Sequence, residues 1–171
     1  CRAGAAIGSN IVAKRLYSTV NVQETTPSLW LTASEMAFCK AEGVLRGWNM
    51  GGGTAKEYYE RGVTLSFNQW GADGVVNYLL DDTSTEANYA DALGGFGGAA
   101  AKASTITIKW DDNAPMDEKM ERLITQKWIA LFPNGQEAWN EIRRTGYPRI
   151  FSVPQATNGY TLLTPNRIPF D

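Results

Sequence analysis

The stretch M-E-R-L-I-T-Q-K-W-I-A-L-F-P-N-G-Q-E-A-W-N-E-I-R-R-T-G-Y-P, residues 120–148, decides the fold. It predicts two helices joined by a tight turn. Large apolar residues recur in the first helix at steps of three and four, at Met120, Leu123, Ile124, Trp128 and Leu131. Pro133 ends this helix because proline lacks the N–H that another turn needs. Asn134 can then cap the second helix, with Glu137 three residues further on as in a capping box.

The second helix completes an α-hairpin over residues 115–146. Its apolar face holds Ala138, Trp139 and Ile142, and Gly146 suits the left-handed residue that often follows a helix. We therefore predict that Trp128 and Trp139 belong to the core, and that Trp139→Ala costs about 3–5 kcal/mol. Arg143 and Arg144 are expected to bond helix-end carbonyls or the C-terminal segment rather than a substrate.

A second hairpin is predicted over residues 32–70. Thr32 with Glu35 and Thr54 with Glu57 have the spacing of two capping boxes, each at the start of a helix. The first helix, extending to residue 48, carries an apolar stripe at Ala33, Met36, Ala37, Ala41, Val44, Leu45 and Trp48. Small residues at Ala37, Ala41, Gly43 and Gly62 would let the two backbones approach closely. Close packing of this kind is typical of tetratricopeptide-type hairpins.

Residues 71–112 form a long irregular insertion between the hairpins. A helical turn is predicted near 75–80, and alternating β-branched residues over 105–110 predict a short strand. The glycine-rich run at 94–98 has no tendency to form a helix. The fold class is therefore mainly α, as one domain over 1–171 with tetratricopeptide-like helical hairpins, this insertion and an irregular tail at 147–171.

Composition and charge exclude several classes of function. The net charge of −2 argues against a nucleic-acid partner. The absence of histidine excludes histidine catalysis and His-ligated metals, and the two cysteines form neither a disulfide framework nor a metal motif. The acidic pairs at 81–82 and 111–112 lack the spacing of an EF-hand, so we expect solvated turns there. The sequence indicates no catalytic residue, cofactor or metal site, and no apolar run long enough to span a bilayer.

Three segments carry a resemblance to a known family. They are I-T-Q-K-W-I-A-L-F-P-N-G-Q-E-A-W-N-E-I-R-R-T-G-Y-P (124–148), T-A-S-E-M-A-F-C-K-A-E-G (32–43) and A-K-E-Y-Y-E-R-G-V-T-L-S-F (55–67). They resemble the C-terminal portion of SusD/RagB-type nutrient-binding outer-membrane lipoproteins, of the subfamily with an ALFPNGQEAW…RRTGYP signature. The end of the chain, N-R-I-P-F, is similar to a family segment but departs from it at Asn166 and Phe170. The resemblance is weak over 1–31 and 75–112.

The resemblance implies a function. It implies a cell-surface protein of the Bacteroidetes outer membrane, used in polysaccharide utilisation, that captures an oligosaccharide or oligopeptide. It would deliver this ligand to a SusC-type TonB-dependent transporter and catalyse no reaction. Membrane attachment would come from a lipid anchor outside this chain, so we expect Cys1 to be a fragment boundary. The alternatives are a tetratricopeptide-like protein-interaction scaffold, and a glycoside hydrolase, for which the spacing indicates no carboxylate pair.

Aromatic residues in and beside the insertion are the candidate ligand-binding residues. They lie where no regular stripe would bury them, and exposed rings stack well on sugars; they are Trp70, Tyr78, Tyr89, Phe96 and Trp110. Asn77, Asp81 and Asn88 could bond sugar hydroxyls. The competing interpretation is that the rings pack beneath a long loop. We expect Trp70 and Trp110 to be at least half-buried, and Tyr89 and Phe96 to be more exposed.

Overall fold

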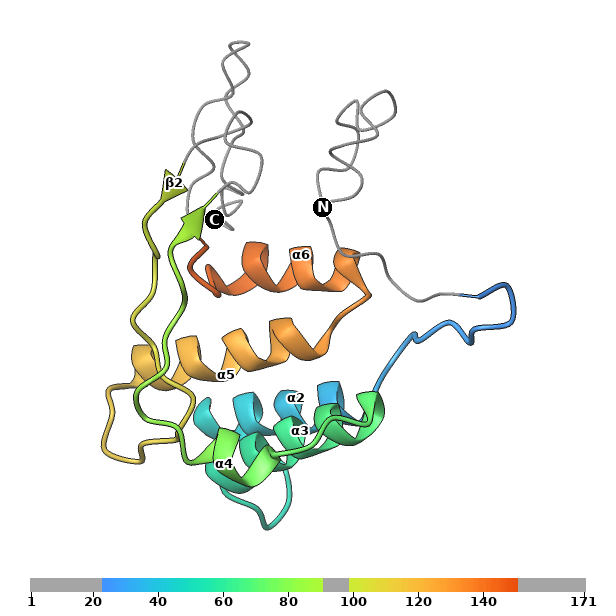
Figure 1. The fold of residues 1–171 in the computed structure, drawn as a ribbon. Helices are drawn as coiled ribbons and strands as arrows, with labels where there is room; N and C mark the ends of the chain where they lie inside the picture. Colours follow the sequence, from blue (N-terminus) through green and yellow to red (C-terminus); the bar gives the residue numbers. More distant parts are fainter. Residues whose placement is uncertain (1–22, 91–98, 151–171) are drawn as a thin grey trace.

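The computed structural model describes residues 23–90 and 99–150. The helices are α2 (Ala33–Leu45), α3 (Ala55–Trp70), α4 (Val75–Leu79), α5 (Met116–Ala130) and α6 (Gly135–Thr145). Strands β1 (Tyr89–Ala90) and β2 (Ala99–Ala100) pair antiparallel within the insertion. Helix α5 lies between α6 and the α2–α3 pair, and the two arms of the insertion run past one end of the helices (Figure 1). The mainly α fold with two helical hairpins is confirmed.

The starts of α2 and α3 use the predicted caps to different extents. At α3, Thr54 N–H donates to Glu57 Oε2 at 2.7 Å and Glu57 N–H donates to Thr54 Oγ1 at 3.2 Å, a complete capping box. At α2, Thr32 Oγ1 accepts from the N–H of Glu35 at 3.1 Å, but the Glu35 carboxyl turns into the protein and its pKa is raised by burial. The predicted extension of α2 to residue 48 is wrong, because the chain turns at Gly47, whose φ is 78°.

Close packing of α2 on α3 depends on Gly62. A Cβ at this position would lie 2.7 Å from the ring of Phe38, and Ser34 Oγ donates to the Gly62 carbonyl at 2.7 Å. The prediction of a close approach is therefore confirmed at Gly62. The predicted stripe on α2 is rotated, however: Phe38 is fully buried, whereas Met36 and Trp48 are exposed.

The core lies between α2, α3 and α5. Its buried members are Phe38, Ala41, Ala55, Tyr59, Val63, Trp110, Leu123 and Ala130. The rings of Tyr59 and Trp110 lie 5.0 Å apart, so the insertion contributes an aromatic side chain to the helical core. The prediction that Trp128 and Trp139 are core residues is wrong, because they are 37% and 43% exposed. Helix α5 instead turns Lys127 inward together with Leu123 and Ile124, which places Trp128 at the edge.

Buried charges join α5 and α6 to α2. Lys127 Nζ lies 2.7 Å from Glu141 Oε1, and both side chains are almost fully buried. Burial opposes the charge on Lys127, but the hydrogen bond to Glu141 and the attraction of nearby negative charge together outweigh burial, so the pKa of Lys127 is raised. Arg144 bonds both carboxylate oxygens of Glu42, at 2.6 and 2.7 Å, and Glu141 Oε2 at 2.7 Å. Among the described residues Arg144 thus binds carboxylates and not helix-end carbonyls, the first of the two expected partners; the second, the C-terminal segment beyond residue 150, lies outside them.

Side chains of α3 and α5 hydrogen-bond the backbone of the insertion. Helix α4 forms where a helical turn is predicted, but the predicted strand from Thr105 to Trp110 is absent. That segment runs extended over the helices, and side chains supply partners for its backbone: Tyr59 Oη donates to the Ile108 carbonyl and Arg122 Nε to the Thr107 carbonyl. No neighbouring strand is needed to satisfy these groups. The glycine-rich run around Phe96 and the tail beyond residue 150 lie outside the described residues.

Candidate functional site

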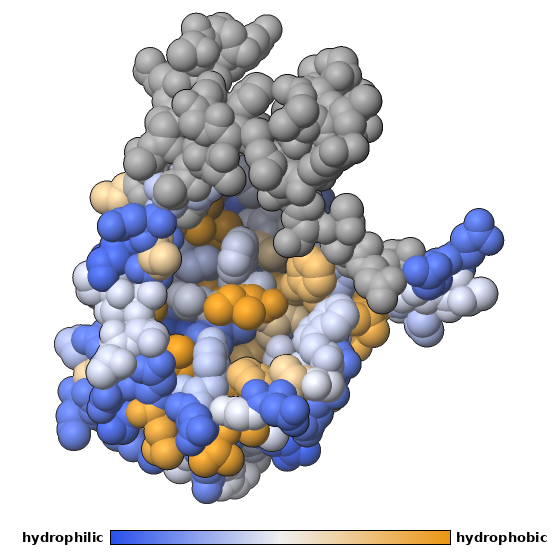
Figure 2. Space-filling view, in the orientation of Figure 1, coloured by the Kyte–Doolittle hydropathy of each residue, from blue (hydrophilic) through white to orange (hydrophobic). Residues whose placement is uncertain are grey.

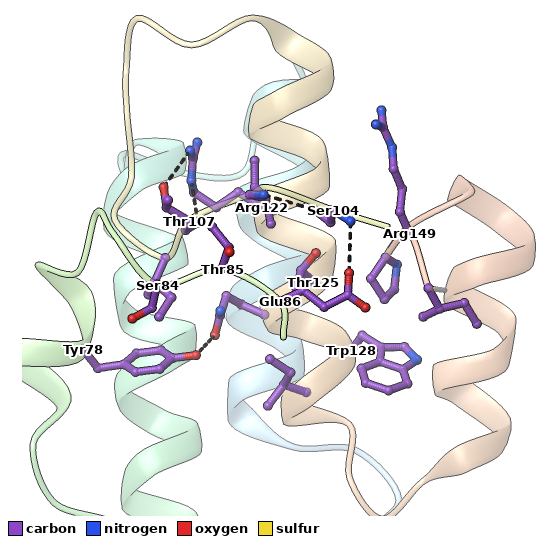
Figure 3. A pocket seen from close by; sticks show the side chains of 16 residues that line it. Tyr78, Ser84, Thr85, Glu86, Ser104, Thr107, Arg122, Thr125, Trp128 and Arg149 are labelled. Carbon is purple, nitrogen blue, oxygen red and sulfur yellow. Dashed lines mark hydrogen bonds between the residues drawn. The ribbon is translucent and has the colours of Figure 1, made fainter. Parts of the chain in front are cut away.

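A cleft of about 280 Å³ opens between the insertion and α5. Its lining comes from α4, both arms of the insertion, α5 and the segment after α6, and includes Tyr78, Ser84, Thr85, Glu86, Ser104, Ile106, Thr107, Ile108, Arg122, Thr125, Gln126, Trp128, Ile129, Pro148, Arg149 and Ile150. We call it the Trp128 cleft (Figure 3). Its volume is near the lower end of the range for small-molecule sites, about 300–1,000 Å³.

The first arm of the insertion reaches the cleft through a turn after α4. Asp81 Oδ1 accepts three hydrogen bonds: from the N–H groups of Thr83 and Ser84, at 2.9 and 2.8 Å, and from the Thr83 hydroxyl at 2.9 Å. These bonds stabilise the charged carboxylate, so the pKa of Asp81 is held well below its usual range. The acidic pair at 81–82 thus forms a hydrogen-bonded turn that brings residues 84–86 over α5.

Glu86 joins the two arms of the insertion across the top of the cleft. Its Oε2 accepts a hydrogen bond from the N–H of Ala103 at 2.9 Å and another from the N–H of Ser104 at 3.0 Å, the second of which is drawn in Figure 3. The hydroxyl of Ser104 in turn donates to the buried carboxylate of Glu121 on α5. The second arm is therefore fixed to both the first arm and the helix.

Helix α5 contributes the floor of the cleft. Gln126 Oε1 accepts from the Tyr78 hydroxyl at 2.9 Å, and burial raises the pKa of Tyr78 (Figure 3). The guanidinium of Arg122 bonds Glu118 through Nη2 at 2.9 Å, but its buried Nη1 has no hydrogen-bond partner in the described part of the chain. Trp128 lies beyond Gln126 on the same helix and forms an aromatic side of the cleft.

The cleft is suited to binding a polar ligand with an apolar face. Ile106, Ile108 and Trp128 supply apolar surface, while hydroxyl, guanidinium and amide groups lie around it. Glu86 is the one carboxylate among the described lining residues. The described residues contain no cluster of three His, Cys, Asp or Glu side chains that could hold a metal ion.

The predicted site residues do not gather in one place. Tyr78 lines the Trp128 cleft, whereas Trp110 is 6% exposed and belongs to the core. Trp70 is 49% exposed at the end of α3, with its ring 5.6 Å from that of Phe132. Tyr89 is half-buried in β1, so the expectation that it is more exposed than Trp70 is wrong. Phe96 lies outside the described residues.

Comparison with protein families gives a match along the whole chain. A family model described as SusD-like, Susd and RagB outer membrane lipoprotein, matches residues 1–171. The chain belongs to the SusD-like family. No helix within 23–90 or 99–150 is both long and apolar enough to cross a membrane. The comparison with curated proteins found no match.

Solved structures of SusD-like proteins share this fold at substantial identity. A SusD homologue from Bacteroides uniformis is 48% identical, with a TM-score of 0.77 over 85% of this chain and 29% of its own. A SusD-like protein from Bacteroides thetaiotaomicron is 49% identical, with a TM-score of 0.72 over 79% of this chain and 28% of its own. A chitin-binding SusD homologue from Flavobacterium johnsoniae is 43% identical, with a TM-score of 0.72 over 81% and 28%. This SusD-like chain therefore spans less than a third of the length of these relatives.

Sequence reasoning missed most residues of the Trp128 cleft in this SusD-like chain. Arg122 and Gln126 lie four residues apart on α5, next to the apolar stripe, and that spacing places both on one helix face. Two polar residues beside a buried stripe are a detectable signal of a partly polar cleft. Glu86 gave no such signal, because its role depends on the backbone of Ser104, eighteen residues away.

Proposed function

We propose that this chain is the C-terminal part of a longer SusD-like protein that binds glycan at the bacterial cell surface. The observation that carries the proposal is the Trp128 cleft, in which a partly exposed indole lies beside hydrogen-bonding groups of both kinds. Pyranose rings offer C–H faces to an aromatic ring and hydroxyls at their edges, which matches this combination. The chitin-binding relative supports a glycan as the ligand.

The proposal does not include catalysis. Hydrolysis of a glycosidic bond commonly requires two carboxyl groups on opposite sides of the bond. The described lining residues supply Glu86 alone, and its Oε2 already accepts two backbone hydrogen bonds. Purified protein should therefore release no reducing sugar from a glycan that it binds.

The family resemblance supports two further parts of the proposal. One is a lipid anchor on the outer face of the outer membrane, and the other is delivery of the ligand to a SusC-type TonB-dependent transporter. Co-purification of the intact SusD-like protein with an outer-membrane transporter tests the second part directly. Recovery of the intact protein without any such transporter, under conditions that keep membrane complexes together, would contradict it.

Binding to the Trp128 cleft can be tested by calorimetry with chitotetraose as the first probe. We expect Trp128→Ala to weaken binding about tenfold, because truncating a residue that anchors a ligand commonly costs more than about 1 kcal/mol. Trp139→Ala is the matched control, because Trp139 is similarly exposed and does not line the cleft. If Trp128→Ala and Trp139→Ala bind chitotetraose with equal affinity, the Trp128 cleft is not the binding site. Failure of chitotetraose and of other neutral oligosaccharides to bind would contradict the glycan function.

A further inference from the structure

A second cleft, of about 730 Å³, lies where three helices end or begin. Its lining comes from the end of α2, the first turns of α5 and the end of α6, at Leu45, Arg46, Trp48, Met116, Asp117, Met120, Arg144, Thr145 and Tyr147. We call it the Trp48 groove. It shares no described lining residue with the Trp128 cleft. It is therefore a separate surface that the proposed function does not use.

The two aromatic residues of the groove have hydrogen-bonded backbones, and their side chains reach solvent. Trp48 is 61% exposed. Its backbone N–H donates to the Gly43 carbonyl at 2.8 Å, and the guanidinium carbon of Arg46 lies 6.0 Å from the centroid of its ring. Tyr147 is similarly placed by its own N–H, which donates to Thr145 Oγ1 at 3.0 Å. Trp and Tyr side chains have only two χ angles, so little conformational entropy is lost when a ligand stacks on their rings.

The polar groups of the groove have hydrogen-bonding capacity to spare. Arg46 uses Nε to bond Glu42 at 2.8 Å, and its two terminal nitrogens have no hydrogen-bond partner in the described part of the chain. The carboxylate of Asp117, in the first turn of α5, also makes no hydrogen bond or ion pair with any described residue. The groove thus presents a free donor and a free acceptor.

The charges of the groove favour a neutral ligand. Both guanidinium groups, those of Arg46 and Arg144, are paired with the carboxylate of Glu42, and Arg144 also bonds Glu141. With Lys127, which pairs with Glu141, and with Asp117, the described charges around the groove are three cations and three carboxylates, so the groove has no net charge to attract an ion of either sign. A neutral ligand with hydroxyl groups can donate to Asp117 and accept from Arg46 without a net charge of its own.

We propose that the Trp48 groove binds a hexose unit of a neutral oligosaccharide. The C–H face of the pyranose stacks on Trp48, one hydroxyl donates to the Asp117 carboxylate, and another accepts from a terminal nitrogen of Arg46. This inference rests on the proposed glycan function and adds a second binding site to it. The two sites can be tested separately, because the exposed indole of each can be removed without touching the other.

The experiment follows the indole N–H signals of ¹⁵N-labelled protein by NMR during titration with chitotetraose, cellotetraose and maltotetraose. The signal that disappears in Trp48→Ala identifies the Trp48 indole, and we expect at least one of these probes to shift it. Trp48→Ala should then weaken binding of that probe at the groove about tenfold. Asp117→Asn, which keeps the side-chain shape, should weaken it as well. Trp30→Ala is the matched control, since Trp30 is highly exposed and lines neither cleft.

Each outcome of the titration supports or overturns the proposal. A shift of the Trp48 signal, with weaker binding in Trp48→Ala and not in Trp30→Ala, supports it. If Trp128→Ala weakens binding while the Trp48 signal stays unchanged, the groove is excluded and the proposed glycan function stands. If none of the neutral probes binds, both are overturned. A preference for oligogalacturonate or for a peptide at Trp48 would overturn the assignment of a neutral sugar.

Discussion

Removal of the Glu141 carboxylate should destabilise the chain more than most single substitutions would. Among the described residues, Glu141 is the one carboxylate that pairs with Lys127 Nζ, at 2.7 Å, and both side chains are almost fully buried. In Glu141→Leu the Lys127 ammonium would be left with the Cys39 thiol, whose Sγ lies 3.5 Å from Nζ. Breaking a buried pair in this way costs about 3–5 kcal/mol. For a chain of this size the melting temperature should fall by about 6–20 °C.

The pH dependence gives this prediction a second measurement. In the wild type the pKa of Lys127 is raised above its ordinary value near 10.5, so its stabilising contribution is present below that value and lost as the pH rises through the raised pKa. Without Glu141, burial favours the neutral amine and lowers the pKa of Lys127. The unfolded chain then holds the proton more tightly than the folded one, so the variant should gain stability as the pH rises toward 10.5.

The assay is urea unfolding followed by circular dichroism at several pH values. Glu60→Leu is the control, because Glu60 pairs with Lys56 at 4.0 Å on the surface and such pairs contribute about 0–1 kcal/mol. The double variant Lys127→Met/Glu141→Leu removes both charges and should recover most of the lost stability, since apolar replacements of buried pairs are often neutral. A loss in Glu141→Leu no larger than in Glu60→Leu, or a double variant no better than the single one, would refute the reasoning.

Three further predictions concern packing and the insertion. Phe38→Ala should cost about 3–5 kcal/mol in urea unfolding, because the ring is fully buried, and Trp139→Ala should cost less than half as much. Gly62→Ala should cost about 1–3 kcal/mol by the same measurement, because its Cβ would lie 2.7 Å from the Phe38 ring. Since the pKa of Asp81 is lowered, its stabilising contribution should be present above the ordinary value near 3.8 and lost as the pH falls below it. Unfolding curves of Asp81→Asn, measured against the wild type in acid, should lack this dependence.

The helices could be predicted from sequence because their signals are local. The Thr54–Glu57 capping box, the break at Pro133 and the end of α6 at Gly146 each depend on residues within one or two turns. Long apolar periodicity also predicted Leu123 and Ile124 correctly as buried residues. The helix-end residues and the apolar periodicity both predict correctly because each depends only on residues near one another in one helix.

Which face of each helix is buried could not be predicted in the same way. Lys127 looks like a surface residue in the sequence, and it is buried because Glu141 of the next helix pairs with it. Burial of Lys127 turns Trp128 toward the edge of α5, which reverses the prediction made for that tryptophan. Trp110 was correctly expected to be at least half-buried, but its packing partner could not be predicted, because Tyr59 lies 51 positions earlier in the sequence.

Neighbouring residues of one segment, 147–148, line the two clefts, and we call this segment the wall. Tyr147 lines the Trp48 groove, and the next residue, Pro148, lines the Trp128 cleft. This wall is held from both sides: the backbone N–H of Tyr147 donates to Thr145 Oγ1 at 3.0 Å, and Arg149 pairs with Glu121 on α5 at 3.4 Å. The charged contacts of Glu141 and Arg144 fix α6 behind it. Ion pairs with buried carboxylates therefore position the wall, whereas the indoles of Trp48 and Trp128 are partly exposed and take no part in these pairs. Substituting either indole should therefore change affinity, whereas substituting Glu141 should change stability and, through the wall, affect both clefts together.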